Sequence, residues 1–118
     1  MDTSQKLKAD AGKLQPRLLF EGMPRALKLA VAVLTYGAQK YEAHSWRGVN
    51  IDRYKDAKAR HMIDGEIEFS DEESGLWHKA HELVDLMFVM ELEMRDMSDG
   101  DFYEYLRFNN PPQEHKND

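Results

Sequence analysis

The chain contains no cysteine, and this absence excludes several kinds of site. Without thiols it can form no disulfide framework, no thiolate zinc site and no cysteine nucleophile. A chain of 118 residues is nevertheless long enough to bury one hydrophobic core without crosslinks. Any metal ion is therefore expected to serve function rather than folding, and the composition is consistent with a reducing compartment.

Long apolar runs are also missing. The first ten residues, MDTSQKLKAD, hold no apolar stretch of the kind that signal peptides carry. The longest apolar run, LKLAVAVL, is too short to cross a bilayer. The sequence therefore predicts a soluble cytoplasmic protein without a membrane partner.

Positive charge is in deficit, since the formal net charge is −6. A general nucleic-acid binder needs a clustered basic surface, because contacts to the phosphate backbone supply most of its sequence-independent affinity. We therefore expect no nucleic-acid partner. A small anionic ligand is compatible with the composition, because a few local lysine and arginine side chains suffice to bind it.

The helical periodicity and the lack of strand-like alternation predict an all-α fold. We expect a small helical bundle of three main helices and a short C-terminal helix, completed by oligomerisation. Residues 1–108 form a single domain that begins with an arm over residues 1–22, and residues 109–118 form a disordered tail. The helices are predicted from Pro24 to a pause at Gly37, from a cap at Asp52 to Gly65, from a cap at Ser70 or Ser74 to about Met97, and over DFYEYLRF after a cap at Asp99.

One acidic residue, Asp85, interrupts the apolar segment LVDLMFVM of the third predicted helix. Val89 and Leu92 continue the side of the helix that carries Asp85, so this side is expected to be buried. A buried carboxylate without a partner is strongly unfavourable. Asp85 therefore needs either the guanidinium of Arg60 on the second helix or a metal ion.

A stripe of four polar side chains runs along the same helix, within about 100° of arc: His78, His81, Glu82 and Asp85. A solvated polar face is the common alternative, and HxxH alone is a weak motif. If the second and third helices pack antiparallel, further donors approach the stripe. The oxygen donors are then Glu66, Asp71, Glu82 and Asp85, and the nitrogen donors are His61, His78 and His81. An oxygen-rich set suits Mg²⁺ or Mn²⁺, whereas a histidine-rich set suits zinc or iron.

Several short motifs occur in order along roughly residues 8–92: KADAGKL, YGAQKY, Trp46-Arg47, RYKDAKARH, Gly65-Glu66, DEESG and His78-x-x-His81. In this combination the sequence resembles the phage dATP/dGTP diphosphohydrolase family, distant relatives of the MazG-like all-α nucleotide pyrophosphohydrolases. The resemblance implies that Glu82 and Asp85 form an ExxD motif that binds Mg²⁺. The companion ExxE motif is absent from the second helix, where Asp56, Arg60, His61 and then Glu66 stand instead.

The resemblance also implies a reaction and a substrate. Purine deoxynucleoside triphosphates, dGTP or dATP, are cleaved between the α and β phosphorus atoms to the monophosphate and pyrophosphate, in control of a phage's nucleotide pool in the host cytoplasm. Phosphoryl transfer depends mainly on positioning and charge neutralisation. The candidate triphosphate-binding cations are Lys8, Lys13, Lys40, Arg47 and Arg60, and the candidate base-stacking rings are Tyr41, Trp46 and Tyr54. Either His61 or Glu66 activates the water.

Two other functions compete with this hypothesis. A transition-metal phosphohydrolase would use His61, His78, His81 and Asp85 as ligands and release phosphate or triphosphate. A helical interaction module would pair the stripe with Arg60 and perform no catalysis. The methionines Met87, Met90, Met94 and Met97 form a flexible apolar run that suits either a core or an interface. The first predicted helix is apolar nearly all round and is easier to bury in an oligomer, and the resemblance implies an oligomer as well. We therefore expect a homodimer or homotetramer.

Overall fold

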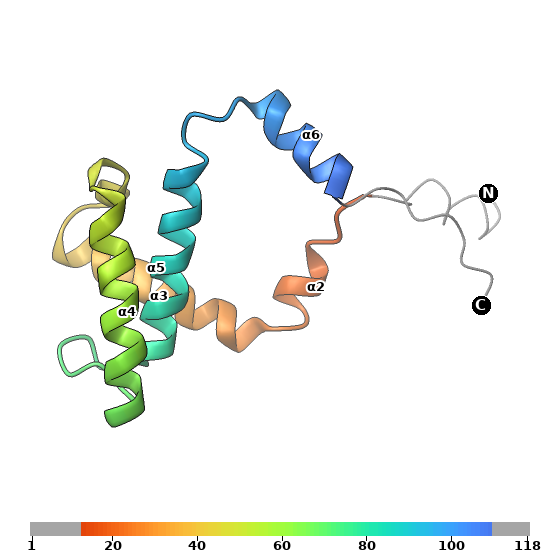
Figure 1. The fold of residues 1–118 in the computed structure, drawn as a ribbon. Helices are drawn as coiled ribbons and strands as arrows, with labels where there is room; N and C mark the ends of the chain where they lie inside the picture. Colours follow the sequence, from red (N-terminus) through yellow and green to blue (C-terminus); the bar gives the residue numbers. More distant parts are fainter. Residues whose placement is uncertain (1–12, 110–118) are drawn as a thin grey trace. The chain divides into compact units, whose positions relative to one another are not determined.

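The computed structural model describes residues 13–109 of the chain. Its elements are α2 (Arg17–Phe20), α3 (Pro24–Lys40), a 3-10 helix η1 (Ser45–Gly48), α4 (Ile51–Ile67), α5 (His78–Glu93) and α6 (Asp99–Asn109) (Figure 1). Within residues 13–109 the only bridge of β type is an isolated one that joins Ser70 to Trp77. The predicted all-α class is confirmed. None of the helices in this part of the chain has the length and apolarity needed to span a membrane.

The chain divides into two compact units, and all the arguments about a site concern the unit Arg17–Arg95. The other unit includes α6, where the Ser98 hydroxyl accepts a hydrogen bond from the Asp101 N–H at 3.1 Å. The predicted cap at Asp99 is therefore wrong, because Asp99 is the first residue of α6 and the preceding Ser98 accepts the N–H instead. The predicted arm and tail lie mostly outside the described residues, although Arg17–Phe20 of the arm forms a short helix rather than a loop.

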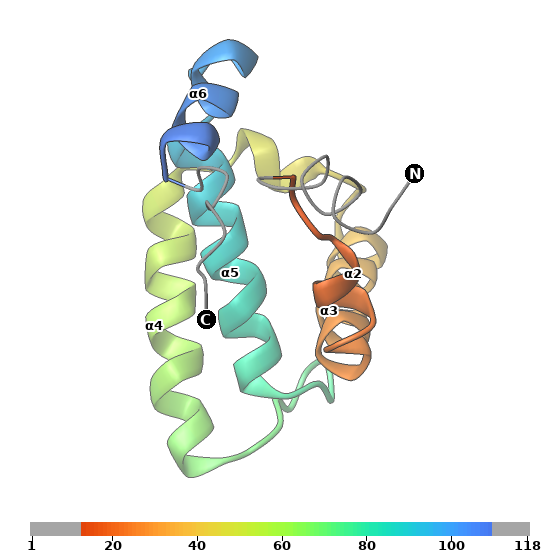
Figure 2. The same ribbon diagram turned by 90° about the vertical axis from the view of Figure 1, so that its right-hand side faces the viewer.

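The three longest helices of the unit Arg17–Arg95 are arranged with α5 in the middle. Figure 2 shows α4 and α5 side by side and antiparallel, as predicted, with α3 on the other side of α5. Ala30 and Val33 of α3 pack on Ala80 and Val84 of α5 to form the buried core. On the α5 side that carries Asp85, the predicted burial of Val89 and Leu92 is confirmed.

The two predicted glycine stops are wrong. Helix α3 continues through Gly37 to Lys40, because one glycine costs a helix only about 1 kcal/mol. Helix α4 continues through Gly65 to Ile67. A Cβ atom at position 65 would lie only 3.2 Å from the Cβ of His78, so this glycine permits close packing instead of ending the helix. The N-cap of α4 is Asn50, whose side chain accepts the Asp52 N–H at 2.8 Å, and not Asp52 itself.

The predicted start of the third helix at Ser70 or Ser74 is also wrong, since α5 spans only His78–Glu93. The polar residues upstream satisfy the backbone of a turn. The Asp71 carboxylate accepts the Ser74 N–H at 2.8 Å, and the Ser74 hydroxyl accepts the Leu76 N–H at 3.1 Å. Gly75 has a φ of 74°, a conformation that favours glycine. The segment 70–77 is therefore a folded turn that leads into α5.

The buried position of Val84 leads to a stability prediction. Val84 is 1% exposed, whereas Ile63 on α4 is 61% exposed, and both lie within helices. Val84→Ala should lower the free energy of unfolding by about 1–3 kcal/mol, because buried methyl groups and their contacts are lost. Ile63→Ala is the control, with a change near zero. Urea denaturation measures both, and equal effects would contradict the assigned core.

Candidate active site

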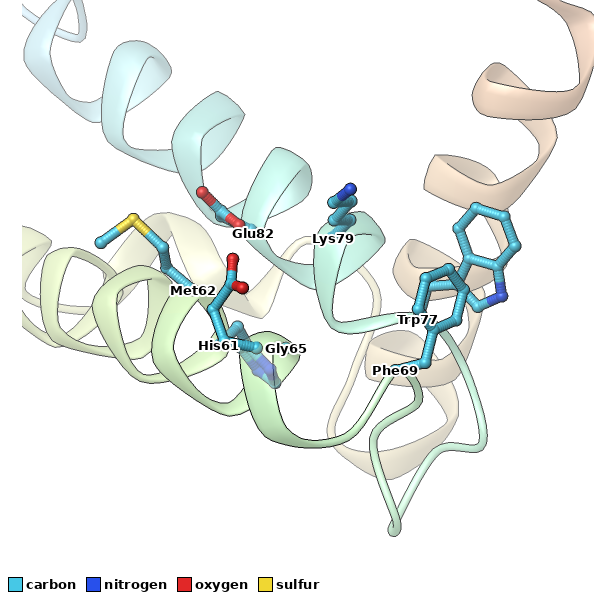
Figure 3. A pocket seen from close by; sticks show the side chains of 8 residues that line it. His61, Met62, Gly65, Phe69, Trp77, Lys79 and Glu82 are labelled. Carbon is cyan, nitrogen blue, oxygen red and sulfur yellow. The ribbon is translucent and has the colours of Figure 1, made fainter.

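An open pocket of about 310 Å³ lies where the end of α4 faces the beginning of α5. Figure 3 shows His61 and Met62 on α4 and Lys79 and Glu82 on α5 around it, with the rings of Phe69 and Trp77 at one side. Gly65 and Glu66 complete the lining. The pocket thus combines two carboxylates, one ammonium group and two aromatic rings. The sequence predicted the two glutamates but not Phe69, Trp77 or Lys79.

A cluster of histidines adjoins this pocket. The Nδ1 atoms of His61 and His78 lie 2.8 Å apart, and the His61 ring stacks on the His81 ring with centroids 4.5 Å apart. Burial lowers the pKa of His61 and of His81 below the ordinary histidine value, and the neighbouring His61 lowers that of His81 further. Both imidazoles are therefore neutral at pH 7, the state in which a ring nitrogen binds a metal or accepts a proton.

The turn 70–77 supplies Asp71 and Ser74 to this cluster. Burial alone would raise the pKa of Asp71, but hydrogen bonds from Ser74 and the nearby His81 and His61 lower it overall, so the carboxyl group is ionised. The Ser74 hydroxyl lies 2.7 Å from Nε2 of His81. Asp71, His61 and His78 each place one ligand atom within 4.8 Å of the others. Among the described residues, this is the grouping of three donors that a single metal ion could bridge.

Asp85 lies one turn further along α5 and is 9% exposed, so the predicted burial is confirmed. Its Oδ2 atom has no hydrogen-bond partner. Burial raises the pKa of Asp85 to about 7, although the Arg60 and Lys58 charges act in the opposite direction. Glu82, which shares its face, lies 3.9 Å from the Lys58 ammonium. The carboxyl group of Asp85 thus has positive charge nearby but lacks a direct partner.

A second polar network joins α3 to the turn 70–77. Lys40 forms an ion pair with Glu73, and this pairing raises the pKa of Lys40 and lowers that of Glu73. Tyr36 also lowers the pKa of the Glu73 carboxyl and meets the His81 ring edge-on, with centroids 6.3 Å apart. The predicted triphosphate ligand Lys40 therefore anchors the turn.

The structure does not place the predicted base-stacking residues in the pocket lining. Trp46 stacks on Phe88 at a centroid distance of 4.5 Å, and Tyr54 packs on the same ring at 4.9 Å. Arg47 lies over Trp46, and the Lys40 ammonium lies over Tyr41. Of the remaining predicted cations, Arg60 lies close enough to Asp85 for its charge to lower the pKa of that carboxyl. Lys13 belongs to the other unit, and Lys8 lies outside the described residues.

Comparison with known proteins establishes the family. A model of the family described as dATP/dGTP diphosphohydrolase, N-terminal, matches residues 3–101. The chain belongs to this family. A protein of Salmonella phage PMBT28, named dATP/dGTP diphosphohydrolase, is 41% identical over 86 residues, which are 70% of this chain and 28% of that protein. The chain thus spans less than a third of that relative's length. No solved structure matches it.

Membership of the dATP/dGTP diphosphohydrolase family confirms the resemblance drawn from the short motifs. The matched region includes the pocket, the histidine cluster and Asp85. Trp77 could have been found from the sequence by its position, because it precedes His78 directly at the start of the polar stripe. Ser74 was assigned only as a possible cap, and its contact with His81 depends on the turn.

The unpaired Asp85 of this diphosphohydrolase-family chain predicts a pH-dependent stability. Between the ordinary aspartate value of 3.8 and about 7, the folded protein keeps a proton on Asp85 that the unfolded chain has lost. The folded state therefore binds more protons, and its free energy of unfolding falls as the pH rises through this window. Asp85→Asn removes this loss and should be more stable than the wild type at about pH 8, by on the order of 2 kcal/mol after allowance for solvent screening.

Urea denaturation of both proteins from about pH 4 to about pH 8, in buffers with a metal chelator, measures this difference. The gain from Asp85→Asn should grow with pH and level off above about 7. A gain that stays constant across the range would show that Asp85 is charged or paired throughout.

Proposed function

We propose that this chain hydrolyses purine deoxynucleoside triphosphates, dGTP or dATP, to the monophosphate and pyrophosphate with the help of Mg²⁺ or Mn²⁺. Family membership supports the reaction class. The observation that carries the proposal is the pocket, in which carboxylates and a lysine face the same space. Its volume of about 310 Å³ is within the range of small-molecule sites.

The carboxylates on α5 suit a magnesium ion that arrives with the triphosphate. Mg²⁺ commonly binds one or two protein carboxylates and takes its other ligands from phosphates and water. Glu82 lines the pocket, and Asp85 follows three residues later with an oxygen that has no partner. Glu82 and Asp85 would hold the ion, which neutralises phosphate charge when bound. Glu66 adds a third carboxylate at the pocket wall.

The remaining groups of the pocket match the needs of attack at the α phosphorus. A water molecule forms a new bond from its oxygen to the α phosphorus, while the bond from that phosphorus to the oxygen bridging to the β phosphorus breaks. Glu66 accepts the proton of the water, and Lys79 stabilises the charge that develops on the departing pyrophosphate. Lys58 and Arg60 add positive charge near Glu82 and Asp85.

Phe69 and Trp77 are the aromatic rings that line the pocket. They contact each other edge to face, with centroids 4.6 Å apart, and are 58% and 45% exposed. Exposed rings beside a polar pocket are suited to stacking on a nucleobase. We therefore assign purine binding to Phe69 and Trp77, since Trp46 and Tyr54 already pack on Phe88.

We further propose a homo-oligomer, a dimer or tetramer, that acts on the nucleotide pool during phage infection. Large apolar side chains on α3 and α5 are substantially exposed in the single chain: Val31, Leu34, Leu83, Leu86, Met87 and Met90. Faces of this kind are typical of association surfaces. The acidic net charge of −6 supports a free nucleotide, and not nucleic acid, as the partner.

A product assay tests the proposed reaction. The protein is incubated with Mg²⁺ or Mn²⁺ and each nucleoside triphosphate, and the products are resolved by ion-exchange chromatography. Monophosphate and pyrophosphate are expected, with dGTP or dATP the best substrates. Inorganic phosphate or triphosphate as product would favour the transition-metal phosphohydrolase. Neither turnover nor a nucleotide-induced rise in melting temperature would favour the interaction module.

The role of Glu82 is tested by its amide variant. Glu82→Gln should lower kcat/KM by at least about a hundredfold, because a charged ligand at the phosphates is lost. Glu72→Gln is the matched control, since this exposed glutamate of the turn 70–77 does not line the pocket. Full activity of Glu82→Gln would show that Glu82 does not bind the metal ion.

The assignment of base binding to the pocket rings is tested by replacing one exposed aromatic residue with leucine in each of two variants. Trp77→Leu should raise KM for dGTP by at least about fivefold with little change in kcat, because one stacking contact is worth roughly 1–3 kcal/mol. Tyr41→Leu is the control, since Tyr41 is 72% exposed and does not line the pocket. A larger KM effect for Tyr41→Leu would restore the stacking site predicted from the sequence.

A further inference from the structure

Three side chains from separate segments converge beside the pocket. His61 comes from α4, Asp71 from the turn 70–77 and His78 from the first position of α5. One ligand atom of each lies within 4.8 Å of the other two. His78 is only 6% exposed, so a polar side chain is held deep against α4. Neither the carboxylate site on α5 nor the stacking rings account for this arrangement.

We propose that His61, Asp71 and His78 form a site for a first-row transition-metal dication, held by two imidazole nitrogens and one carboxylate oxygen. This site is separate from the magnesium ion assigned to Glu82 and Asp85. Two imidazoles and one carboxylate form a borderline ligand set that suits Zn²⁺, Mn²⁺ or Fe²⁺ better than Mg²⁺, which prefers oxygen.

The distance between the facing nitrogens of His61 and His78 is close to the distance between two nitrogens bound to one metal ion. The Nδ1 atoms of His61 and His78 are 2.8 Å apart. Two nitrogens bound to one tetrahedral Zn²⁺ at about 2.0–2.1 Å are roughly 3.3 Å apart, so the rings need to separate by only about half an ångström. Without a metal, one of the two nitrogens must carry a proton for the contact to be favourable. A metal ion would bind both lone pairs.

The surroundings of the three ligands hold them in place. The Ser74 N–H donates to the Asp71 carboxylate at 2.8 Å, and the His81 ring stacks flat on His61, at an interplanar angle of 9°. Nε2 of His81 is engaged by the Ser74 hydroxyl at 2.7 Å. Supporting contacts of this kind orient metal ligands in known sites. His81 therefore supports the site and is not itself a ligand, in contrast to the histidine-rich set considered from the sequence.

Gly65 makes the approach of His78 to α4 possible. A Cβ atom at this position would lie 3.2 Å from the His78 Cβ, a distance tighter than an ordinary contact. The metal would link α4, the turn and α5 at one point. Because Phe69 directly precedes that turn and Trp77 ends it, the ion would fix the rings that line the pocket. We therefore assign it a positioning role.

Metal content tests this inference without any activity measurement. The protein is produced without a polyhistidine tag, and its metals are determined by inductively coupled plasma mass spectrometry. About one equivalent of zinc, manganese or iron per chain is expected. Co²⁺ added to chelator-treated protein should produce a visible d–d absorption band and raise the melting temperature. Absence of both the native metal and the Co²⁺ band would overturn the proposal.

The Asp71→Asn variant tests the ligand set while preserving the fold. Its side-chain oxygen can still accept the Ser74 N–H, but the negative charge is lost. Co²⁺ affinity should fall at least about tenfold. Glu72→Gln changes the charge of the adjacent residue and should leave the affinity unchanged. Equal Co²⁺ affinity for Asp71→Asn and wild type would overturn the proposal, with circular dichroism confirming that both are folded.

The two metal sites are distinguished by competition and by turnover. Excess Mg²⁺ should leave the Co²⁺ band intact, and loss of the band would identify a single oxygen-type site and overturn the inference. The inference does not rest on the proposed function. Hydrolysis of dGTP with Mg²⁺ alone, by protein that takes up no transition metal, would overturn it and leave the proposed function standing.

Discussion

The close antiparallel packing of α4 against α5 is the contact on which the other features depend. At one end Gly65 allows His78 to approach α4, which brings His61 and His78 within 2.8 Å. Further along, the same packing buries Asp85 among Lys58, Arg60 and apolar neighbours. The pocket lies where the two helices diverge into the turn 70–77. One helix pair thus sets the spacing of the carboxylates, the histidines and the stacking rings.

Much of the fold followed from the sequence because its signals are local. Helical periodicity identified α3, α4 and α5, and the apolar continuation through Val89 and Leu92 correctly predicted that Asp85 is buried. The errors occurred where one residue type has two uses. The sequence predicts a helix stop at Gly65, but this glycine permits close packing. It also predicts a helix cap at Ser74, but this serine stabilises a turn.

The site was harder to predict because its members are joined by tertiary contacts. Asp71 precedes α5 and has no place on its helical faces. The turn nevertheless brings the Asp71 carboxylate close to the imidazoles of His61 and His78. The aromatic residues near the motif Trp46-Arg47 suggested base stacking, but Phe88 covers the Trp46 ring. Trp77 and Phe69, which remain exposed, carry no periodic signal. Their position depends on the bridge between Ser70 and Trp77, and sequence spacing does not reveal that pairing.

The central claim is that the pocket between α4 and α5 binds a magnesium-bound deoxynucleoside triphosphate. Nuclear magnetic resonance of ¹⁵N-labelled protein with Mg²⁺ and the non-hydrolysable α,β-methylene analogue of dGTP tests it most directly. Amide shift changes are expected at residues that line the pocket, among them Met62, Gly65, Glu66, Lys79 and Glu82. Shift changes centred on Trp46 and Tyr54 instead, or no change at saturating analogue, would contradict it.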